Sequence, residues 1–462
     1  MPFLRRHERQ GSSPARAVVP AATPEAADRA ITRLLAEWEL RLRRFQEEGG
    51  GALPTGPAGS DNPEVVAARQ RVVQQLAALG PAALEPLVRT LRPDILNDLT
   101  LGRAVMATLA LGRMGDFRAA PALLAALGDR GEGRERARAA AATALGELKA
   151  EAAATLYEQT LTGQISADWQ AKAKRLGALP METVVEALVE ALRDPAPEVR
   201  AAAADACIDL CLADPPPALL FGSGRQTWYS TLAGAVEPLI EALKDDSAAV
   251  RAHASTALGW IGDARVAASL SACLKDPDEH CRAAAALALG MLRSPLALKP
   301  LARALGDASA AVRQQVAESL GELGDPITAD LLLDALADEQ EVVEVRAAAA
   351  RALGNLHLPH ALPIFQGLLG APDPALRIAA IEALGRLGFG RAYRLLAPIL
   401  WRDPDRAVRH AAARVVAQLA EARQGRARWR LRLALRVARQ ARKEALVILE
   451  ESARHAHQAL RE

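Results

Sequence analysis

Four cysteines and eight histidines are the side chains of this sequence that could hold a metal ion or act as nucleophile and base. Cys207 and Cys211 lie four residues apart and could share one helix face. A zinc site would need two more ligands nearby, and none is evident. His357 and His360 flank a loop, where packing or solvent contact is the ordinary role. We therefore predict no metal site and no cofactor, and we expect the cysteines to be buried small hydrophobic residues.

Motifs for catalysis are also missing. The sequence has no glycine-rich nucleotide loop, no HExxH zinc motif and no GxSxG nucleophile motif. The stretch GSGRQ at 222–226 lacks the rest of any phosphate-binding pattern. We therefore name no catalytic or cofactor-binding residue and predict that the protein is not an enzyme.

The composition indicates which kind of element must position the side chains. Half of the residues are apolar, yet only six Phe, six Trp and three Tyr occur. A core with so few rings must be filled by alanine, leucine and valine, which suits close packing of helices. The sequence has no run of 18 apolar residues and no apolar core of a signal peptide. We therefore expect a cytoplasmic protein without a transmembrane segment.

Charge is distributed unevenly along the chain. The formal net charge is +2, but residues 423–443 carry nine basic side chains and no acidic one. Residues 1–16 are also basic, so the body between these two segments is acidic. An acidic body does not suit a long phosphate-binding groove, and we do not expect nucleic acid to be the partner.

An internal repeat dominates the sequence. Segments such as VRAHASTALGWIGD (250–263) and VRQQVAESLGELGD (312–325) begin with an arginine that a glycine follows eight residues later. Upstream, Gly177 ends AKAKRLG, which we interpret as a degenerate copy. The arginines of the regular copies are 31, 31, 33, 31 and 32 residues apart: Arg251, Arg282, Arg313, Arg346, Arg377 and Arg409.

Each period predicts two helices. The first is short and leucine-rich, as in TADLLLDAL (328–336), with apolar residues at helical spacing. A polar turn follows, and then an alanine-rich helix, as in Ala347–Ala350. We expect this second helix to stop at its glycine, which tolerates the left-handed conformation after a helix. The pattern predicts an all-α protein, a right-handed α-solenoid of about eleven helix pairs over residues 64–420.

On these residues the chain resembles the HEAT-repeat family, and in particular the HEAT-like repeats of the phycobilin lyase type. The resemblance implies a stack of helix pairs and is weak for function, because such repeats serve unrelated tasks. It also implies a ladder between repeats, built from a turn aspartate and the arginine six residues later. Gln340 and Ala371 replace that aspartate twice, so we expect interruptions there. The matching pairs are Asp194/Arg200, Asp245/Arg251, Asp276/Arg282, Asp307/Arg313 and Asp403/Arg409.

The segment before the repeats divides into three parts. Residues 1–22 are expected to be a disordered tail, and residues 49–63 a Gly/Pro linker. Between them, residues 23–48 predict one amphipathic helix that begins at Thr23 and Pro24. This helix either caps the exposed end of the solenoid or serves as a tethered helix for the groove of a partner.

An insertion at 212–234 adds about twenty residues to the period. It carries three consecutive prolines and three of the few aromatic residues, Phe221, Trp228 and Tyr229. Either these rings pack on the neighbouring repeats, or they contact a partner, since Trp and Tyr dominate binding hot spots. We take them as candidate partner-binding residues.

The C-terminal segment, 421–462, predicts a basic helical region. Arg432, Arg436, Arg439 and Lys443 lie on one helical stripe. They form either the solvated face of a capping helix or a contact for an anionic partner. A peripheral contact with an anionic membrane surface is one such contact.

The function that these features favour is a non-catalytic scaffold or adaptor. We expect a protein partner on the concave surface, which the second helices line in HEAT proteins. Two alternatives stay open: a subunit or chaperone that resembles phycobilin lyases, and a HEAT-like protein that binds nucleic acid.

Overall fold

A computed structural model describes residues 23–47, 63–91, 98–131, 133–161, 181–212, 232–358, 361–387 and 389–421. Within these residues the protein is all α-helical, joined by turns and short 3₁₀ segments, and contains no strand. The chain divides into two compact units, Met1–Ile261 and Gly262–Glu462. Each unit is a stack of helix pairs, so the predicted all-α solenoid is confirmed.

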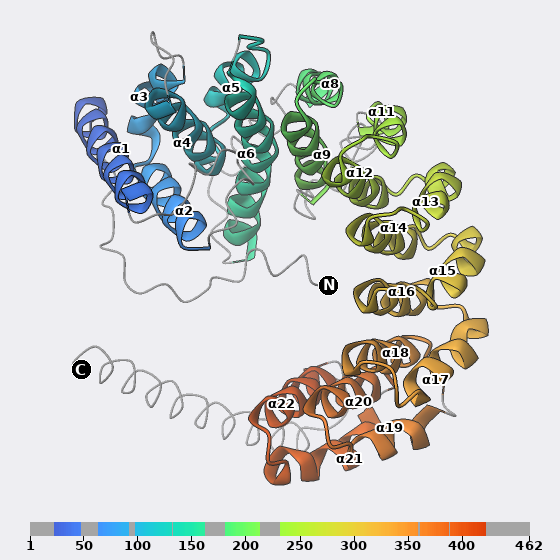
Figure 1. Ribbon diagram of the computed structural model, residues 1–462. Helices are drawn as coiled ribbons and strands as arrows, with labels where there is room; N and C mark the ends of the chain where they lie inside the picture. Colours follow the sequence, from blue (N-terminus) through green and yellow to red (C-terminus); the bar gives the residue numbers. More distant parts are fainter. Residues whose placement is uncertain are drawn as a thin grey trace. The chain divides into compact units, whose positions relative to one another are not determined.

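Unit 1 holds the first ten helices that the structure describes (Figure 1). They come in successive pairs, in which a first helix leads into a second helix. The helices are α1 (Pro24–Glu47), α2 (Pro63–Ala77), α3 (Leu84–Thr90), α4 (Asp98–Met114), α5 (Ala120–Leu127), α6 (Glu135–Leu161), α8 (Met181–Ala191), α9 (Pro197–Leu212), α11 (Val236–Ala242) and α12 (Ala248–Ile261).

Unit 2 repeats the arrangement more regularly. Four of its five described first helices have seven to nine residues, the last one has 14, and its second helices have 13 to 16. The helices are α13 (Ala267–Cys273), α14 (Glu279–Leu292), α15 (Leu298–Ala304), α16 (Ala310–Leu323), α17 (Ala329–Ala337), α18 (Val343–Asn355), α19 (Leu362–Leu368), α20 (Pro374–Leu387), α21 (Phe389–Arg402) and α22 (Arg406–Glu421).

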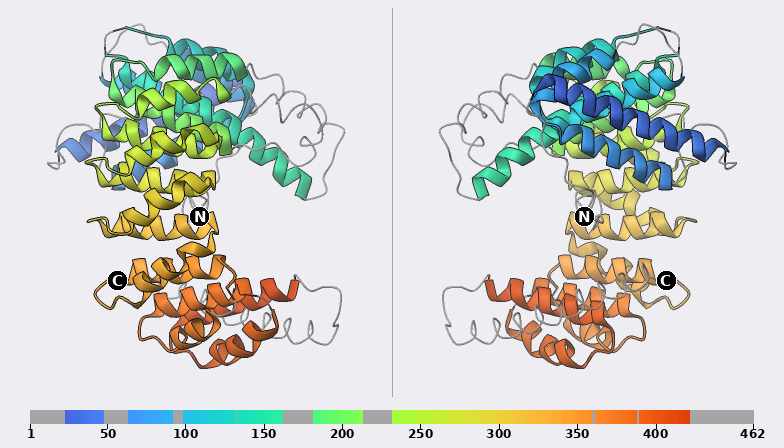
Figure 2. Two further views of the ribbon diagram at one scale, coloured as in Figure 1. Left: turned by 90° about the vertical axis from the view of Figure 1, so that its right-hand side faces the viewer. Right: turned by 90° about the vertical axis from the view of Figure 1, so that its left-hand side faces the viewer.

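The two helices of a pair belong to two different rows (Figures 1 and 2). The second helices pack directly on one another, as α14, α16, α18, α20 and α22 do in unit 2. Each first helix packs on its own second helix, as α13 does on α14 and α17 on α18. We call these the second-helix row and the first-helix row. The core lies between the two rows of each unit.

Alanine fills most of the contact between second helices. Ala347, Ala348, Ala349 and Ala350 are all buried in α18, as are the equivalent alanines of α6. Leucines such as Leu353 and Leu332 close the space toward the first helices, and Phe365 is the largest fully buried side chain described. Small side chains allow the second helices to approach closely, and the leucines supply most of the apolar burial.

The repeat glycines do not end the second helices, so the sequence-based prediction is wrong on this point. Helix α16 continues through Gly321 to Leu323, and the left-handed residue is Gly324, with φ 71°. Helix α14 likewise passes Gly290 and ends before Arg293, with φ 48°. The physical reason is close approach: a Cβ on Gly321 would lie 2.6 Å from the Cα of Ala352 in the next second helix.

Gly177, interpreted from the sequence as the end of a degenerate repeat copy, lies outside the described residues. Helix α6 packs directly on α9, and a Cβ on Gly146 would lie 2.9 Å from the Cα of Ala206. Among the described helices, α9 is therefore the next member of the second-helix row after α6. Residues 162–180 lie outside the described residues.

Helix α1 packs on α2 and α3 at the start of unit 1. Ile31, Leu34, Leu35 and Trp38 are buried at helical spacing, as expected of the amphipathic helix that the sequence predicts. Glu39 of α1 accepts hydrogen bonds from the guanidinium of Arg103 in α4, which adds a charged contact. Among the described residues, no helix is both long enough and apolar enough to cross a membrane.

Candidate functional site: the arginine ladder and the second-helix face

Arg282 shows the geometry of the contact between successive repeats. Its Nε and Nη2 donate to the Oδ2 and Oδ1 of Asp307, at 2.7 and 2.9 Å. Its Nη1 donates backward to the carbonyl oxygen of Asp276, at 2.9 Å. Asp307 also accepts a hydrogen bond from the backbone N–H of Ser309, at 2.8 Å. One guanidinium thus ties its own turn to the turn of the next repeat.

The same contact recurs in both units. Arg200 binds the carboxylate of Asp245 in this way, and Arg377 binds that of Asp403. An arginine also contacts the aspartate six residues before it, by donating to that aspartate's backbone carbonyl oxygen. Arg251 donates to Asp245 and Arg409 to Asp403 in this way. The carboxylate serves the arginine of the preceding repeat. Spacing within one repeat could not reveal this partner.

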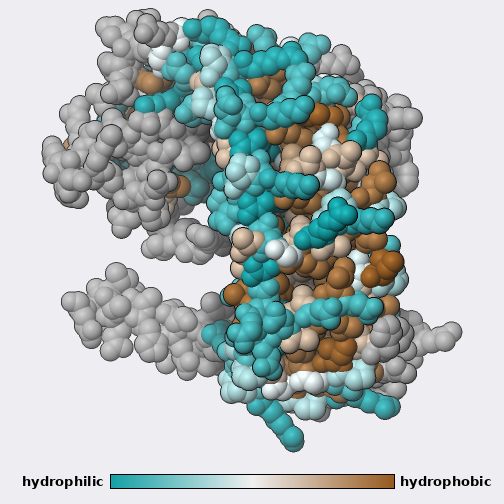
Figure 3. Space-filling view, turned by 45° about the vertical axis from the view of Figure 1, so that its right-hand side comes forward, coloured by the Kyte–Doolittle hydropathy of each residue, from teal (hydrophilic) through white to brown (hydrophobic). Residues whose placement is uncertain are grey.

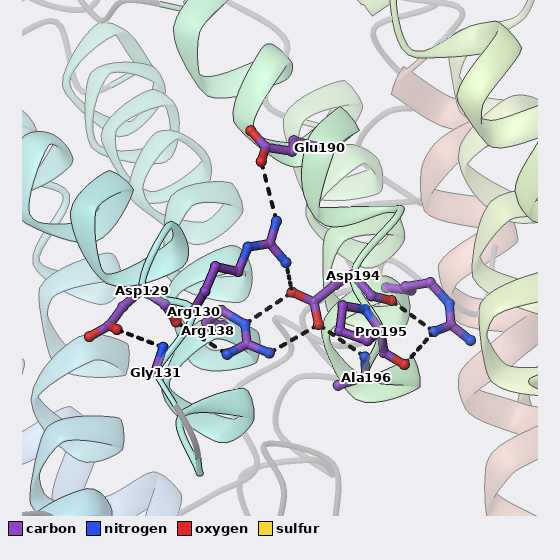
Figure 4. Close-up of polar contacts among 9 residues, drawn as sticks. Asp129, Arg130, Gly131, Arg138, Glu190, Asp194, Pro195 and Ala196 are labelled. Atoms are coloured by element: carbon purple, nitrogen blue, oxygen red, sulfur yellow. Dashed lines mark hydrogen bonds and ion pairs between the residues drawn. The ribbon is translucent and has the colours of Figure 1, made fainter.

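Asp194 is the most buried carboxylate of the ladder, at 2% exposure. Arg138 donates to both of its oxygens, at 3.0 and 3.1 Å, and Arg130 adds a second guanidinium (Figure 4). The N–H of Ala196 donates to the same carboxylate at 3.0 Å. Sequence reasoning missed both arginines as partners of Asp194. The signal for Arg138 was present, because it precedes Gly146 by eight residues.

The expected interruption at Gln340 does not occur. Arg313 binds Glu341, the next residue, with both contacts at 2.7 Å. The longer glutamate side chain compensates for its shifted position. Ala371 stands where the turn aspartate that would bind Arg346, the arginine of the preceding repeat, is expected. The Nε of Arg346 instead donates to the carbonyl oxygen of Leu336. Arg377 itself still binds Asp403.

The ladder shifts the pKa values of its carboxyl groups. Burial alone would raise the pKa of Asp307, but hydrogen bonds from Arg282 and from the Ser309 N–H outweigh it, so the pKa is lowered. The pKa of Asp245 is lowered in the same way, because hydrogen bonds from Arg200 and from the Ser247 N–H outweigh the effect of burial. The Arg313 hydrogen bond lowers the pKa of Glu341. The charged forms are therefore the stable ones.

The outer surface of the second-helix row carries a separate set of charges, which we call the second-helix face. In unit 2, Arg351 of α18 binds Glu318 of α16, at 3.1 Å. Arg414 of α22 binds Glu382 of α20, at 2.5 Å. Arg386 of α20 donates to the carbonyl oxygen of Arg351, at 2.9 Å. Acidic and basic side chains thus interlock across successive helices.

Several candidate residues lie outside the described residues. These are Phe221, Trp228 and Tyr229 of the insertion and Arg432, Arg436, Arg439 and Lys443 of the C-terminal segment. Within the described ranges, no group of three or more His, Cys, Asp or Glu is arranged to hold a metal ion. Cys207 and Cys281 are buried, and burial raises the pKa of the Cys207 thiol to about 12.

Comparison with known proteins agrees with this geometry. The family model described as HEAT repeats matches residues 218–290, 236–308, 270–344 and 340–417. A model for the HEAT repeat matches 184–213, and one for the PBS lyase HEAT-like repeat matches 104–129. The chain belongs to the HEAT-repeat family. The expected resemblance is therefore confirmed. No curated protein matches the sequence.

The chain is also similar to several solved structures, including the following three. The complex of CpcE and CpcF of phycocyanin lyase from Nostoc sp. PCC7120 has 24% identity and a TM-score of 0.37, covering 56% of this chain and 94% of that one. Escherichia coli YibA has 20% identity and a TM-score of 0.44, with coverages of 69% and 96%. A designed armadillo repeat protein has 18% identity and a TM-score of 0.32, with coverages of 58% and 99%. These similarities carry no functional argument.

Proposed function

We propose that this HEAT-repeat protein is a non-catalytic scaffold that binds a protein partner along the second-helix face. The observation that carries the proposal is the interlocked charge on that face, Glu318–Arg351 and Glu382–Arg414 in unit 2. A surface of this kind presents both signs of charge in fixed positions. It suits a partner of mixed charge better than a phosphate backbone, which needs an excess of lysine and arginine.

The fixed positions favour selective binding. Arg351 is held both by Glu318 and, through its carbonyl oxygen, by Arg386. Side chains that are already ordered lose less conformational entropy when a partner binds. The ladder also favours selective binding, because it fixes the spacing of the second helices that carry the face.

The experiment reverses two exposed charges of this face, Arg386→Glu with Arg414→Glu. Both side chains make surface contacts, so the fold should tolerate the change. The matched control carries the same change of charge at Lys244→Glu with Lys275→Glu, in the turns after α11 and α13, where both lysines are exposed. Each tagged protein is purified from the native host, and the co-purifying proteins are quantified by mass spectrometry.

Wild type and control should retain the same partner, and the reversed variant should lose it by at least about tenfold. Equal retention by all three proteins would contradict binding through this face. Melting temperatures of the three proteins show whether each remains folded.

A lyase-like subunit is the second candidate, because residues 104–129 match the PBS lyase HEAT-like repeat. Co-expression with a phycobiliprotein and its bilin tests it. A coloured covalent adduct that forms only when this chain is present would replace the scaffold proposal.

The insertion is proposed as a second contact for the partner. The double substitution Trp228→Ala with Tyr229→Ala should weaken binding by about 2 kcal/mol or more if these rings form a hot spot. A lowered melting temperature with unchanged affinity would indicate that the rings pack on the repeats instead.

The basic residues around Arg436 are proposed to contact an anionic partner. Binding to vesicles with and without phosphatidylserine tests whether that partner is a membrane surface.

A further inference from the structure

Three large apolar side chains are exposed on α17 and on the turns that lead into α15 and α17, in the first-helix row of unit 2. Leu296 is 72% exposed, Ile327 is 70% exposed, and Leu331 is exposed beside them. Leu296 lies in the 3₁₀ turn Pro295–Ala297 that leads into α15, and Ile327 lies in the equivalent turn, Pro326–Thr328, before α17. Figure 3 shows apolar surface between hydrophilic side chains on the side where α13, α15 and α17 lie.

Charges of opposite sign accompany these apolar residues. Helix α15 exposes Lys299 and Arg303, and helix α17 exposes Asp330 and Asp334. Within each pair the residues are four apart, so they share one face of their helix. None of the four makes an ion pair within the described part of the chain.

The register of the two helices is the same. Leu296 and Ile327, Lys299 and Asp330, and Arg303 and Asp334 are each 31 residues apart, which is the repeat period. The first helices on either side carry small or uncharged residues at the charged positions. These residues are exposed as well: Ala268 and Ala272 in α13, and Pro363 and Gly367 in α19. One basic helix and one acidic helix thus stand side by side with uncharged neighbours.

We propose that a second copy of this chain docks on this surface, through a two-fold axis that runs between α15 and α17 and parallel to them. Such an axis places α15 of one copy against α17 of the other and keeps positions along the helices unchanged. Lys299 of each copy then meets Asp330 of its partner, Arg303 meets Asp334, and Leu296 meets Ile327. Leu331 extends the apolar contact.

Self-complementarity is the reason for choosing a second copy as the occupant. A two-fold interface uses one patch twice, so the patch must match itself after rotation. Here the basic helix of one copy always meets the acidic helix of the other. The four ion pairs lie along the helices, next to an apolar contact that Leu296 and Ile327 form in the turns before them. Two helices from each chain make a small contact, so the dimer is expected to be weak and sensitive to salt.

The dimer is independent of the proposed scaffold function, because it uses the first-helix row. The second-helix face of unit 2 remains open in each copy. Two such faces in one assembly would strengthen binding to a partner that offers repeated sites.

The test is sedimentation velocity of the full chain over a range of concentrations. The acidic variant carries Lys299→Asp with Arg303→Asp, and the basic variant carries Asp330→Lys with Asp334→Lys. A fourfold variant carries all four substitutions. The control, Lys244→Asp with Lys275→Asp, changes exposed charges elsewhere. Circular dichroism establishes that every variant is folded.

Wild type and control should dimerise, with a dissociation constant of roughly 1–100 μM that rises with salt. The acidic and basic variants should each weaken self-association by at least about tenfold, and an equimolar mixture of the two should form a heterodimer. The fourfold variant should dimerise with itself again and not with wild type. A monomeric wild type up to about 100 μM would overturn the proposal. So would association that the acidic variant leaves unchanged, or a mixture that stays monomeric.

Discussion

At the scale of single residues, the repeat glycines set how closely the second helices pack. The sequence predicts their position but assigns them the wrong role, because a glycine near the end of a helix usually indicates a left-handed cap. The structure places the left-handed residue three positions later, as at Gly324 after Gly321. The signal for close packing was the buried residue that faces each glycine, most often an alanine such as Ala352 opposite Gly321, and this contact depends on tertiary structure.

A pair of substitutions tests this role. In Gly354→Ala, the new Cβ would lie 2.6 Å from the Cα of Ala383, so one helix must shift. We expect the free energy of unfolding to fall by about 1–3 kcal/mol. Gly367→Ala is the control, because no atom lies within 4 Å of its Cβ, and alanine favours the helix by about 0.5–1 kcal/mol. Chemical denaturation measures both variants. Equal effects of the two substitutions would refute the close-packing role.

The ladder arginines make a second prediction at this scale. The Arg282 side chain is 15% exposed and that of Asp307 is 10% exposed, and removal of the arginine leaves this carboxylate without its cation. Arg282→Ala should therefore cost on the order of 3 kcal/mol. Glu322→Ala is the control, since its pair with Arg293 is exposed and should contribute less than about 1 kcal/mol. An unchanged denaturation midpoint for Arg282→Ala would show that solvent compensates for the lost contact.

At the scale of elements, helix α1 packs on α2 and α3 through the apolar face of the amphipathic helix that the sequence predicts. The helical spacing of Ile31, Leu34, Leu35 and Trp38 was sufficient to identify the buried face. The sequence could not show which surface receives it, because the contact of Glu39 with Arg103 joins residues 64 positions apart.

Two substitutions in α1 separate docking from a free helix. Trp38 is 7% exposed and Leu40 is 52% exposed. Trp38→Ala should weaken the packing of α1 on α2 and α3 by about 3–5 kcal/mol, whereas Leu40→Ala should change this packing free energy little. Hydrogen exchange of the α1 amides measures this directly. Rapid exchange in both variants and in wild type would mean that α1 is not docked in solution.

The turns between helices make the ladder sensitive to acid. The pKa values of Asp245 and Asp307 lie below the ordinary 3.8, and that of Glu341 lies below 4.5. Their contribution to stability is complete above those ordinary values and is lost as the pH falls through the lowered ones. We therefore expect the difference in denaturation midpoint between wild type and Asp307→Asn to be constant from pH 7 to about 5.

Below the ordinary value of 3.8, that difference should shrink as Asp307 becomes protonated in wild type. Urea denaturation at a series of pH values measures it. A difference that stays constant down to pH 2 would show that the carboxylate charge is not the source of the stability.

At the scale of the whole molecule, the sequence predicts the fold because one short pattern recurs many times. Each copy of the arginine–glycine spacing supports the others, so local errors do not alter the architecture. The contacts between copies were harder to predict. Arg200 binds Asp245, which lies beyond the insertion in the sequence. Glu341 takes the place of the turn aspartate and binds Arg313, although it lies one residue later than that aspartate would. Both depend on how successive turns meet in space.

The functional account depends equally on this arrangement. The pairing of Glu318 with Arg351 joins equivalent positions of successive second helices, so the face exists only once the repeats are stacked. The sequence predicts which helices line it and not how its charges pair. Binding along the face should therefore involve several second helices together.

Hydrogen exchange of the chain alone and in complex with its co-purified partner tests the central claim most directly. Binding through the second-helix face predicts slower exchange in α14, α16, α18 and α20 of the complex, with the first helices α13, α15 and α17 unchanged. Slower exchange only in the first helices, the insertion at 212–234 or the segment 421–462 would contradict the claim that the second-helix face binds the partner.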